Sequence, residues 1–330
     1  MIAFLSNEVS GFTLERCSDY VHWDEFVLNS EQSNIFCTSK FFRVLPARHQ
    51  LFWLSENGKL RLGVIIHEAL KNGAPYSFVY NGIVWDPSVT EMPIHRRVRK
   101  QLELTEELFG RLTKITGKIR LSLHHSIKDI RGLQWFNYHE PQLGRFETRI
   151  AYTALLNLAQ FQAPDDLLKG FRQVRRQEYH RILGMGFSVE ESSDPGELFR
   201  LHTKAFERQG LKLSQEEEAF SGVLAKKALE NGFGRLVYCL SSGGDVAAAC
   251  LFLHDKKCGY YLVGATNAEF RQQAPGTLAL TNQLLWCLNE GMEWVDFVGV
   301  NSPNRGDYKT SFGAEVVPYY EVTLNVSCSE

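Results

Sequence analysis

The same order of secondary-structure elements is predicted twice along this chain of 330 residues. Residues 50–66 predict a β-hairpin, because two apolar runs flank Asn57-Gly58, a pair that favours a tight turn. Residues 235–253 predict a second hairpin around Gly243-Gly244. Each hairpin is followed by a third strand, a helix and a further strand. We therefore expect an α/β fold of the α+β type, with two mixed sheets packed side by side and parallel strands only where a helix crosses over.

The remaining elements complete the two halves. The first half continues with a strand at 76–85, a charged helix at 92–116 and a strand at 118–123. The second half continues with a strand at 258–265, a helix at 276–290 that stops at Gly291, and a strand at 293–298. Three more helices are predicted between the halves, at 165–185, 195–209 and 216–230. The repeated order fits an internal duplication, although residue identity between the halves is slight.

Composition and charge exclude some classes of protein. The hydrophobic fraction is 44% and the charged fraction is 22%, which is ordinary for a globular protein. The formal net charge is −2 and the isoelectric point is about 6.6. A protein that coats nucleic acid would be far more basic, so we do not expect one here.

Cysteine usage and apolar run lengths bear on the compartment. The seven cysteines are scattered and form no Cys-x-x-Cys pair, which indicates reduced thiols. The N-terminus lacks the basic region of a signal peptide. The longest apolar runs, such as 246–253, have the length of a strand and cannot span a bilayer. We predict a cytoplasmic protein without membrane insertion.

Several common site types are not supported by the sequence. His124 and His125 are adjacent, so on a strand they would point to opposite faces, and no Cys/His quartet for a metal exists. The sequence also lacks a Gly-x-Ser-x-Gly elbow, a Walker lysine motif and a Gly-x-Gly-x-x-Gly turn after a strand. We therefore predict no metal site. The sequence does not favour a kinase, a P-loop protein or a dinucleotide-dependent dehydrogenase.

Residues 296–313 gather chemistry-bearing side chains after a predicted strand. Gly299 and Asn301 lie in a Gly/Asn/Pro loop, and a short turn follows that carries Tyr308 and Lys309, before a strand resumes at Val316. The C-terminal ends of strands in α/β proteins are common places for ligands. A fixed lysine can stabilise an oxyanion or pair with a phosphate. A solvated surface lysine is the alternative.

Asp296 and the strand at 258–265 add to this region. Asp296 alternates with apolar neighbours, so its carboxylate is either buried and hydrogen-bonded or open to a cleft as a general base. Tyr260 and Tyr261 point to opposite faces of their strand, so at most one of them meets a ligand. Gly264 ends the same strand. Packing within the sheet explains either tyrosine equally well.

Two further segments could bind anions. The loop at 271–277 follows a strand and opens a helix, and free backbone N–H groups at a helix start favour phosphate or carboxylate. Arg271, Gly276 and Thr277 are its candidate binding residues, although Pro275 removes one N–H donor. The helix around Arg176 is basic on one side and could contact phosphates. An ordinary loop and a solvated helix face are the alternatives.

Four local features together resemble Fem-type aminoacyltransferases and their GNAT-like relatives. They are Tyr152-Thr-Ala-Leu-Leu-Asn-Leu, Arg175-Arg-Gln-Glu-Tyr-His-Arg-Ile-Leu-Gly-Met-Gly, Tyr260-Tyr-Leu-Val-Gly-Ala, and the segment from Asp296 to Gly313. The resemblance covers most of the chain and is best from Tyr152 onward. It implies two GNAT-like acyltransferase domains in tandem, which we place at 1–147 and 148–330. In such folds the strand at 258–265 would splay from the next one and offer its edge to a ligand.

The resemblance also implies an activity and a set of site residues. Fem-type enzymes move an amino acid from aminoacyl-tRNA to a cell-wall precursor, and relatives acylate amines of envelope or surface-polysaccharide precursors. Lys309 matches the lysine near their acyl-transfer centre, and 271–277 matches the segment where GNAT enzymes hold coenzyme A. By this resemblance Lys309 and Asp296 are catalytic, acyl-CoA or aminoacyl-tRNA is the co-substrate, and the substrate-binding residues are Tyr308, Asn301, Gly299, Tyr261, Gly264 and Arg176. The stretch at 129–138 is similar to the corresponding stretch of relatives from gene clusters for polysaccharide biosynthesis.

The sequence thus predicts an acyltransferase that forms an amide bond on an amine of an envelope precursor, with an amino sugar as one possible acceptor. The amine would attack a thioester or ester carbonyl, and Asp296 or the substrate itself would accept the proton. A non-catalytic module that binds a glycan or a nucleotide sugar is the alternative. RNA binding through the helix around Arg176 is a third hypothesis, against which the nearly neutral net charge argues.

Overall fold

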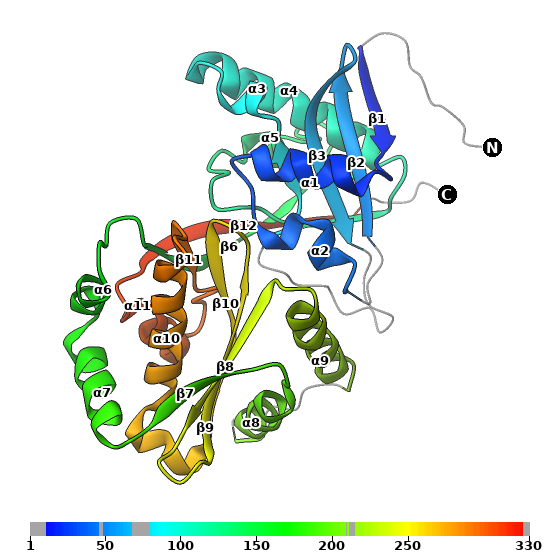
Figure 1. Cartoon of the computed structure of the whole chain (residues 1–330). Coiled ribbons are helices and arrows are strands. Elements are labelled where there is room, and N and C mark those ends of the chain that lie inside the picture. Colours follow the sequence, from blue (N-terminus) through cyan, green and yellow to red (C-terminus); the bar gives the residue numbers. More distant parts are fainter. Residues whose placement is uncertain (1–10, 46–48, 68–79, 209, 211–214, 326–330) are drawn as a thin grey trace. The chain divides into compact units, whose positions relative to one another are not determined.

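The computed structural model describes residues 11–45, 49–67, 80–208, 210 and 215–325 (Figure 1). The chain divides into two compact units. Unit 1 contains Met1–Phe42, Ala47–Ala151 and Pro318–Glu330, and unit 2 contains Arg43–Pro46 and Tyr152–Val317. Two strands, β6 (Glu147–Asn157) and β12 (Glu315–Asn325), run from one unit into the other. The domain boundary between 147 and 148 stays a prediction.

Unit 1 contains a four-stranded antiparallel sheet in the order β1 (Phe12–Arg16), β2 (His49–Glu56), β3 (Lys59–His67) and β4 (Ile83–Trp85). Asn57 and Gly58 join β2 to β3 with φ angles of 50° and 74°, so the predicted hairpin and its left-handed turn are confirmed. Strand β5 (Lys118–Ser122) pairs with the end of β12. The helices are α1 (Tyr20–Asn29), α2 (Ser39–Phe42), α3 (Pro87–Thr90), α4 (Ile94–Leu112) and α5 (Arg131–Gln134), with 3₁₀ turns at Ile35–Cys37 and Pro141–Leu143.

Both faces of this sheet are packed. Leu104 and Leu108 of α4 lie in one core with Leu62 and Val64 of β3. A tryptophan of α1, Trp23, packs on the sheet with its ring centroid 4.6 Å from that of Trp53. A Cβ atom at Gly63 would lie within 3 Å of both indole rings, so only glycine fits beneath them. The predicted strand at 76–85 is described only from residue 80 onward, and its residues 76–79 lie outside the described part.

Unit 2 contains six strands in the order β6, β11 (Trp294–Asp296), β10 (Cys258–Thr266), β9 (Val246–His254), β8 (Gly234–Leu240) and β7 (Ser188–Ser192). Strands β10 and β11 pair in parallel, because helix α10 (Pro275–Asn289) connects them. The other helices are α6 (Pro164–Gly170), α7 (Gln173–Gly184), α8 (Gly196–Glu207), α9 (Gln215–Glu230) and α11 (Pro303–Thr310), with a 3₁₀ turn at Ala268–Gln273.

Alternating residues of these strands fill two separate cores. Cys250 and Phe252 of β9 face a core that contains residues of α6, α7 and α10. Their neighbours Ala249 and Leu251 face a core with residues of α8 and α9. Helices therefore cover both faces of this sheet, as Figure 1 shows. Hairpin, strand, helix and strand recur in both units, which confirms the predicted mixed α/β architecture.

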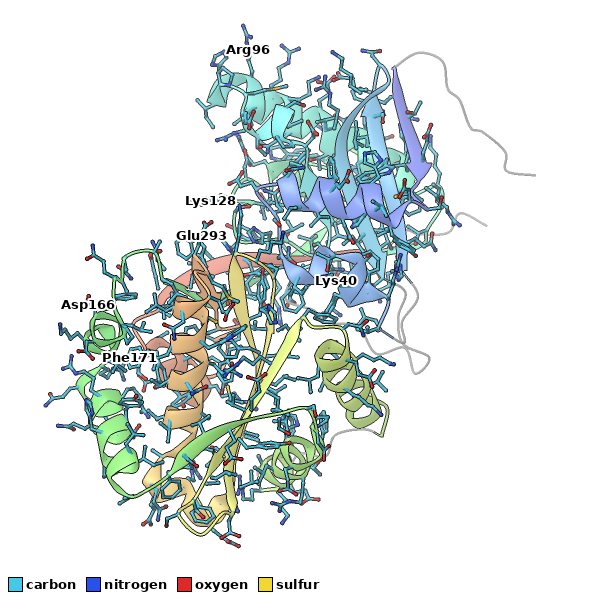
Figure 2. The ribbon with its side chains drawn as sticks, in the orientation of Figure 1. Lys40, Arg96, Lys128, Asp166, Phe171 and Glu293 are labelled. Atoms are coloured by element: carbon cyan, nitrogen blue, oxygen red, sulfur yellow. The ribbon has the colours of Figure 1, made fainter. Side chains whose placement is uncertain are left out.

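Three local predictions were wrong. The predicted helix at 165–185 is two helices, because the backbone is extended at Phe171 between them (Figure 2). Phe171 is buried, and its ring packs edge-on against that of Phe312, with ring centroids 5.0 Å apart. The predicted turn at Lys309 is the helix α11. His124 and His125 follow β5 and do not point apart, since their ring centroids are only 4.0 Å from each other. Alternation holds within a strand, and these two residues lie just after one.

Candidate functional site

Strands β10 and β11 separate shortly after they begin. Their parallel ladder pairs Cys258–Tyr260 with Trp294–Asp296 and then ends. Beyond it β10 continues along β9 as far as Thr266, with a shift in register between Tyr261 and Val263. After Tyr260, β10 is therefore no longer paired with β11, as expected for the splayed arrangement that the family resemblance implies.

The turn after β11 has an unusual backbone that buried polar groups hold in place. Val298 has a φ of 48° and Gly299 a φ of 86°. A β-branched residue in this left-handed region is strained, by about 1–3 kcal/mol. The carboxylate of Asp296, only 1% exposed, accepts a hydrogen bond from the Val298 N–H at 2.7 Å and another from the Thr153 hydroxyl. The Gly299 N–H in turn donates to the Thr153 hydroxyl oxygen at 3.3 Å.

This turn directs three carbonyl groups at Lys309. The Lys309 ammonium donates to the carbonyl oxygens of Phe297 at 2.6 Å, Val298 at 3.3 Å and Gly299 at 2.9 Å. It also lies 5.1 Å from the ring centroid of Tyr261, a favourable cation–π distance. Burial lowers the pKa of Lys309 to about 8, while the nearby Asp296 carboxylate opposes that shift. The site therefore contains a largely buried lysine whose charge is sensitive to pH near neutrality.

Tyr261 is fitted tightly against its own strand. A Cβ atom on Gly264 would lie 2.0 Å from the Tyr261 hydroxyl oxygen, so the phenol occupies the space that any side chain at position 264 would need. Burial raises the pKa of Tyr261 well above its ordinary value. Tyr260 is buried on the opposite face and donates to Asp255 at 2.8 Å. Only Tyr261 meets the lysine, in agreement with the expected alternation.

A second polar cluster lies at the start of α10. The Thr277 hydroxyl donates to a Glu178 carboxylate oxygen at 2.7 Å, and Arg175 donates to the same oxygen at 2.5 Å. The Arg175 guanidinium lies 4.9 Å from the ring centroid of Tyr308. The Tyr308 hydroxyl is 3.5 Å from the position of a Cβ atom on Gly276. The predicted residues Gly276, Thr277 and Tyr308 thus belong to one cluster, which two residues of α7 complete.

Three other predicted residues have structural contacts of their own. The side-chain amide of Asn301 pairs with the backbone of Tyr152, accepting from its N–H at 2.7 Å and donating to its carbonyl at 3.1 Å. The Arg176 guanidinium donates to the Lys169 carbonyl at 2.9 Å. Arg271 is exposed, and its carbonyl accepts from the Ala274 N–H at 3.2 Å. Their roles in binding substrate stay predictions.

Sequence reasoning missed Thr153, Arg175 and Glu178 as members of the site. Thr153 is fully buried within the apolar stretch 150–156 of β6, and a lone hydroxyl in such a stretch is the signal that was available. Arg175 and Glu178 are three residues apart on α7, a spacing that places an ion pair on one helix face. The long-range partners of these side chains could not be read from the sequence.

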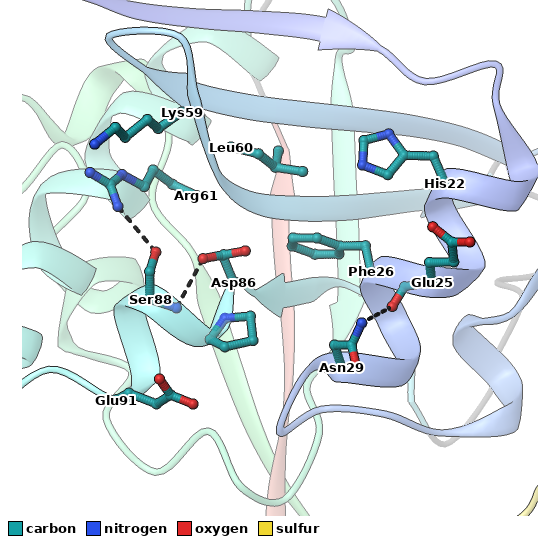
Figure 3. Close-up of a pocket in the computed structure, with 11 residues that line it drawn as sticks. His22, Glu25, Phe26, Asn29, Lys59, Leu60, Arg61, Asp86, Ser88 and Glu91 are labelled. Atoms are coloured by element: carbon teal, nitrogen blue, oxygen red, sulfur yellow. Dashed lines mark hydrogen bonds between the residues drawn. The ribbon is translucent and has the colours of Figure 1, made fainter.

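Unit 1 has a polar groove of about 880 Å³ that contains none of the predicted site residues. Phe26, Leu60 and Pro87 are its apolar residues, and Arg61 donates to the Ser88 hydroxyl at 3.1 Å on one side (Figure 3). Asp86 accepts from the Ser88 N–H at 2.9 Å, so this carboxylate caps α3. Among the described residues, no group of three or more His, Cys, Asp or Glu side chains could hold a metal ion. Nor does any helix in the described ranges combine the length and apolar character needed to cross a bilayer.

Comparisons with known proteins agree with the fold. Residues 168–310 match the model of the acetyltransferase (GNAT) domain. A search of curated proteins finds no match. Among solved structures, FemX superposes with a TM-score of 0.66 at 14% identity, covering 93% of this chain and 96% of FemX.

Two other structures resemble the chain over nearly its whole length. A tandem GNAT protein from the clavulanic acid biosynthesis pathway has a TM-score of 0.57 at 12% identity, covering 97% of this chain and 100% of that one. A conserved protein of unknown function from Bacteroides thetaiotaomicron VPI-5482 has a TM-score of 0.56 at 11% identity, with 96% and 100% covered. Residues 168–310 are therefore similar to a GNAT acetyltransferase domain, and the chain as a whole has the fold of FemX and of a tandem GNAT protein.

Proposed function

We propose that this protein is an N-acyltransferase that forms an amide bond on an amine of a cell-envelope or surface-polysaccharide precursor, with Lys309 at the reacting centre. The observation that supports this most is a partly buried lysine, held over Tyr261, at the point where β10 and β11 separate. The edge of β10 offers backbone N–H and C=O groups to an extended substrate. The GNAT match and the likeness to FemX support the class of reaction, and the acceptor is part of the proposal.

In the proposed reaction, the amine attacks the ester or thioester carbonyl of the donor, forming the C–N bond and a tetrahedral oxyanion. The Lys309 ammonium stabilises that oxyanion by giving up one of its three carbonyl partners. The collapse of the intermediate expels the alcohol or thiol of the donor. Because Asp296 is buried and bonded to Thr153 and Val298, we assign it the positioning of this turn, and the amine's proton passes to the leaving group of the substrate.

The start of α10 bears on the choice of donor. GNAT enzymes resembling this chain hold the coenzyme A pyrophosphate at this helix start. Here Pro275 has no N–H, and the Glu178 carboxylate is bonded to the Thr277 hydroxyl in the first turn. This carboxylate, whose charge Arg175 balances, occupies the Thr277 hydroxyl that a pyrophosphate would otherwise use as a donor. The residues therefore do not fit a pyrophosphate, and of the two donors we propose the aminoacyl ester over acyl-CoA.

A variant of Lys309 tests the catalytic proposal. The protein would be incubated with aminoacyl-tRNA or acetyl-CoA and with UDP-glucosamine as the amine, and the amide product measured by mass spectrometry. We expect Lys309→Met to lower kcat by about 10²–10³-fold, the usual effect of removing an oxyanion donor. Lys169→Met is the matched control, because that lysine has a 74% exposed side chain on α6. A folded Lys309→Met protein with full turnover would exclude the role.

The second candidate function is a non-catalytic module that binds a nucleotide sugar or a glycan. The Glu178 carboxylate that is bonded to Thr277 favours this second candidate, because it occupies a site that a catalytic GNAT unit would use. A thermal-shift screen separates the two candidates, since a ligand of the folded state raises the Tm. Stabilisation by a donor supports the transferase, whereas stabilisation by UDP-sugars alone supports the binding module.

A further inference from the structure

The segment 131–145 of unit 1 presents three large apolar side chains to solvent. Trp135 is 50% exposed, Tyr138 57% and Leu143 50%. Tryptophan is seldom this exposed, because burying its large apolar ring stabilises a folded protein strongly. Two neighbours in the same segment, Leu133 and Phe136, are buried in the core of unit 1. The segment is thus anchored from below while its outer rings stay open.

Short-range hydrogen bonds hold the segment together. The Tyr138 N–H donates to the Trp135 carbonyl at 3.0 Å, and the Asn137 amide donates to the Gly144 carbonyl at 2.8 Å. Arg145 donates to the Gln134 carbonyl at 3.1 Å. These bonds connect residues 134–138 to residues 144–145. A surface that is ordered before binding loses less entropy when it meets a ligand.

A guanidinium lies over each exposed ring. Arg131 is 5.3 Å from the ring centroid of Trp135, and Arg145 is 5.1 Å from that of Tyr138. The two arginines differ in their charge partners. Arg131 forms an ion pair with Asp129 at 2.6 Å, whereas Arg145 has no ion pair within the part of the chain that the structure describes. The Arg145 end of the surface can therefore accept an anionic group.

We propose that Trp135, Tyr138, Leu143 and Arg145, which we call the aromatic platform, bind a saccharide chain that carries acidic groups. The apolar C–H face of a pyranose ring would stack on the open aromatic rings, and a carboxylate or phosphate of the chain would pair with Arg145. Exposed polar side chains at the border, such as Gln134 and Glu140, can bond sugar hydroxyls. This inference does not depend on the proposed acyl transfer, because it concerns a different surface, in unit 1.

The observations favour a saccharide over two other partners. A stable protein interface buries about 800 Å² on each partner, and three side chains that are half exposed supply far less. Single-stranded RNA also stacks on aromatic rings, but it needs a basic groove along its backbone. Between residues 128 and 145 three cations, Lys128, Arg131 and Arg145, face two carboxylates, Asp129 and Glu140. This near balance of charge suits one acidic sugar rather than a polyanion.

Calorimetric titration with two matched probes tests the proposal. Hyaluronan tetrasaccharide carries carboxylates, and chitotetraose is a neutral chain of similar size. We expect the intact chain to bind hyaluronan tetrasaccharide more tightly than chitotetraose. Trp135→Ala and Tyr138→Ala should each weaken both ligands by about tenfold, the upper end for an aromatic contact. Trp294→Ala is the control, because Trp294 is 38% exposed on β11 of unit 2 and should leave both affinities unchanged.

Arg145 variants separate charge from shape. Arg145→Gln should weaken hyaluronan tetrasaccharide by roughly tenfold while leaving chitotetraose unchanged, and Arg145→Lys should retain most of the preference. Failure of both sugars to bind at millimolar concentration would overturn the proposal. The proposal would also be overturned if Trp135→Ala bound the sugars as tightly as the intact protein does. A third contrary result would be that Trp135→Ala loses binding to oligouridylate and not to the sugars. Acyl transfer can fail in the assays above while sugar binding succeeds, so the two proposals are tested separately.

Discussion

The two units place very different groups where their third and fourth strands part. In unit 2 a partly buried lysine and a strained turn lie where the ladder between β10 and β11 ends. In unit 1 the corresponding place, between β4 and β5, is closed by a single bridge in which Asn81 and Ser122 exchange backbone hydrogen bonds at 2.8 and 3.2 Å. Beside the bridge, Tyr80 is 1% exposed and packs 4.8 Å from His124 and 5.7 Å from Tyr319.

The two strand junctions also differ in the charge of their side chains. The Nδ1 atom of His124 accepts from the backbone N–H of Ser126 at 3.2 Å, so the ring is neutral with its proton on Nε2. Burial and the neighbouring His125 keep the pKa of His124 well below its usual value. Unit 1 therefore has a neutral His124 ring at its strand junction, and unit 2 has a lysine there. The same order of elements supports either outcome, so the residues at the junction decide which groups each unit holds there.

The largest expected effect tests the claim that the junction of unit 1 is core. Tyr80→Ala should lower the free energy of unfolding of unit 1 by about 3–5 kcal/mol, because it removes a fully buried aromatic ring. Urea denaturation followed by circular dichroism measures this loss. Tyr138→Ala serves as the control, since that ring is exposed and its removal should change stability by less than about 0.5 kcal/mol. A Tyr80→Ala loss as small as the control's would mean that the junction is not packed.

The next effect sharpens the view that Tyr261 is fixed beneath Lys309. Gly264→Ala should destabilise unit 2 by about 3 kcal/mol, because the new methyl group would overlap the Tyr261 hydroxyl and force the ring to move. Adding Tyr261→Phe to this variant should recover part of the loss. Gly184→Ala in α7 is the matched control, since no atom lies within 4 Å of its added Cβ. Equal stabilities of the two alanine variants would contradict the packing described here.

A smaller effect concerns the hydroxyl that holds the turn of unit 2. Thr153→Val should lower stability by about 2 kcal/mol, because Asp296 and the Gly299 N–H each lose a buried hydrogen bond. Thr153→Ser keeps the hydroxyl and should lose less. The comparison is made by urea denaturation at pH 7. If valine and serine were equally tolerated, the Thr153 hydroxyl would not be needed to hold the turn, and the other bonds of the turn, such as that of Asp296 with the Val298 N–H, would suffice.

The repeated order of elements, the hairpin turns and the alternation of Tyr260 and Tyr261 could be predicted from the sequence, since turn residues and strand alternation are local signals. The contacts that define the site could not. Nothing in the sequence near Lys309 shows that its partners are three backbone carbonyls, because these depend on the left-handed conformation of Val298. Likewise, Glu178 and Thr277 are 99 residues apart, and only the packing of α7 on α10 brings them together.

The smallest effect follows from the charge of Lys309 and separates the two units by pH. The pKa of Lys309 is about 8 in the folded protein, against 10.5 for an ordinary lysine such as that of the unfolded chain. Between these two pH values the unfolded chain therefore binds more protons than the folded protein does. The free energy of unfolding should therefore rise with pH in this window, by about 1 kcal/mol between pH 7 and pH 9.

Buried tyrosines with raised pKa values act in the opposite direction above pH 9, so the quantity to measure is the difference in free energy of unfolding between the intact protein and Lys309→Met. That difference should grow from pH 7 to pH 9, whereas turnover should fall as the ammonium loses its proton. A difference that stays flat across this range would mean that Lys309 keeps an ordinary pKa, and the contrast between a neutral junction in unit 1 and a titrating one in unit 2 would not hold.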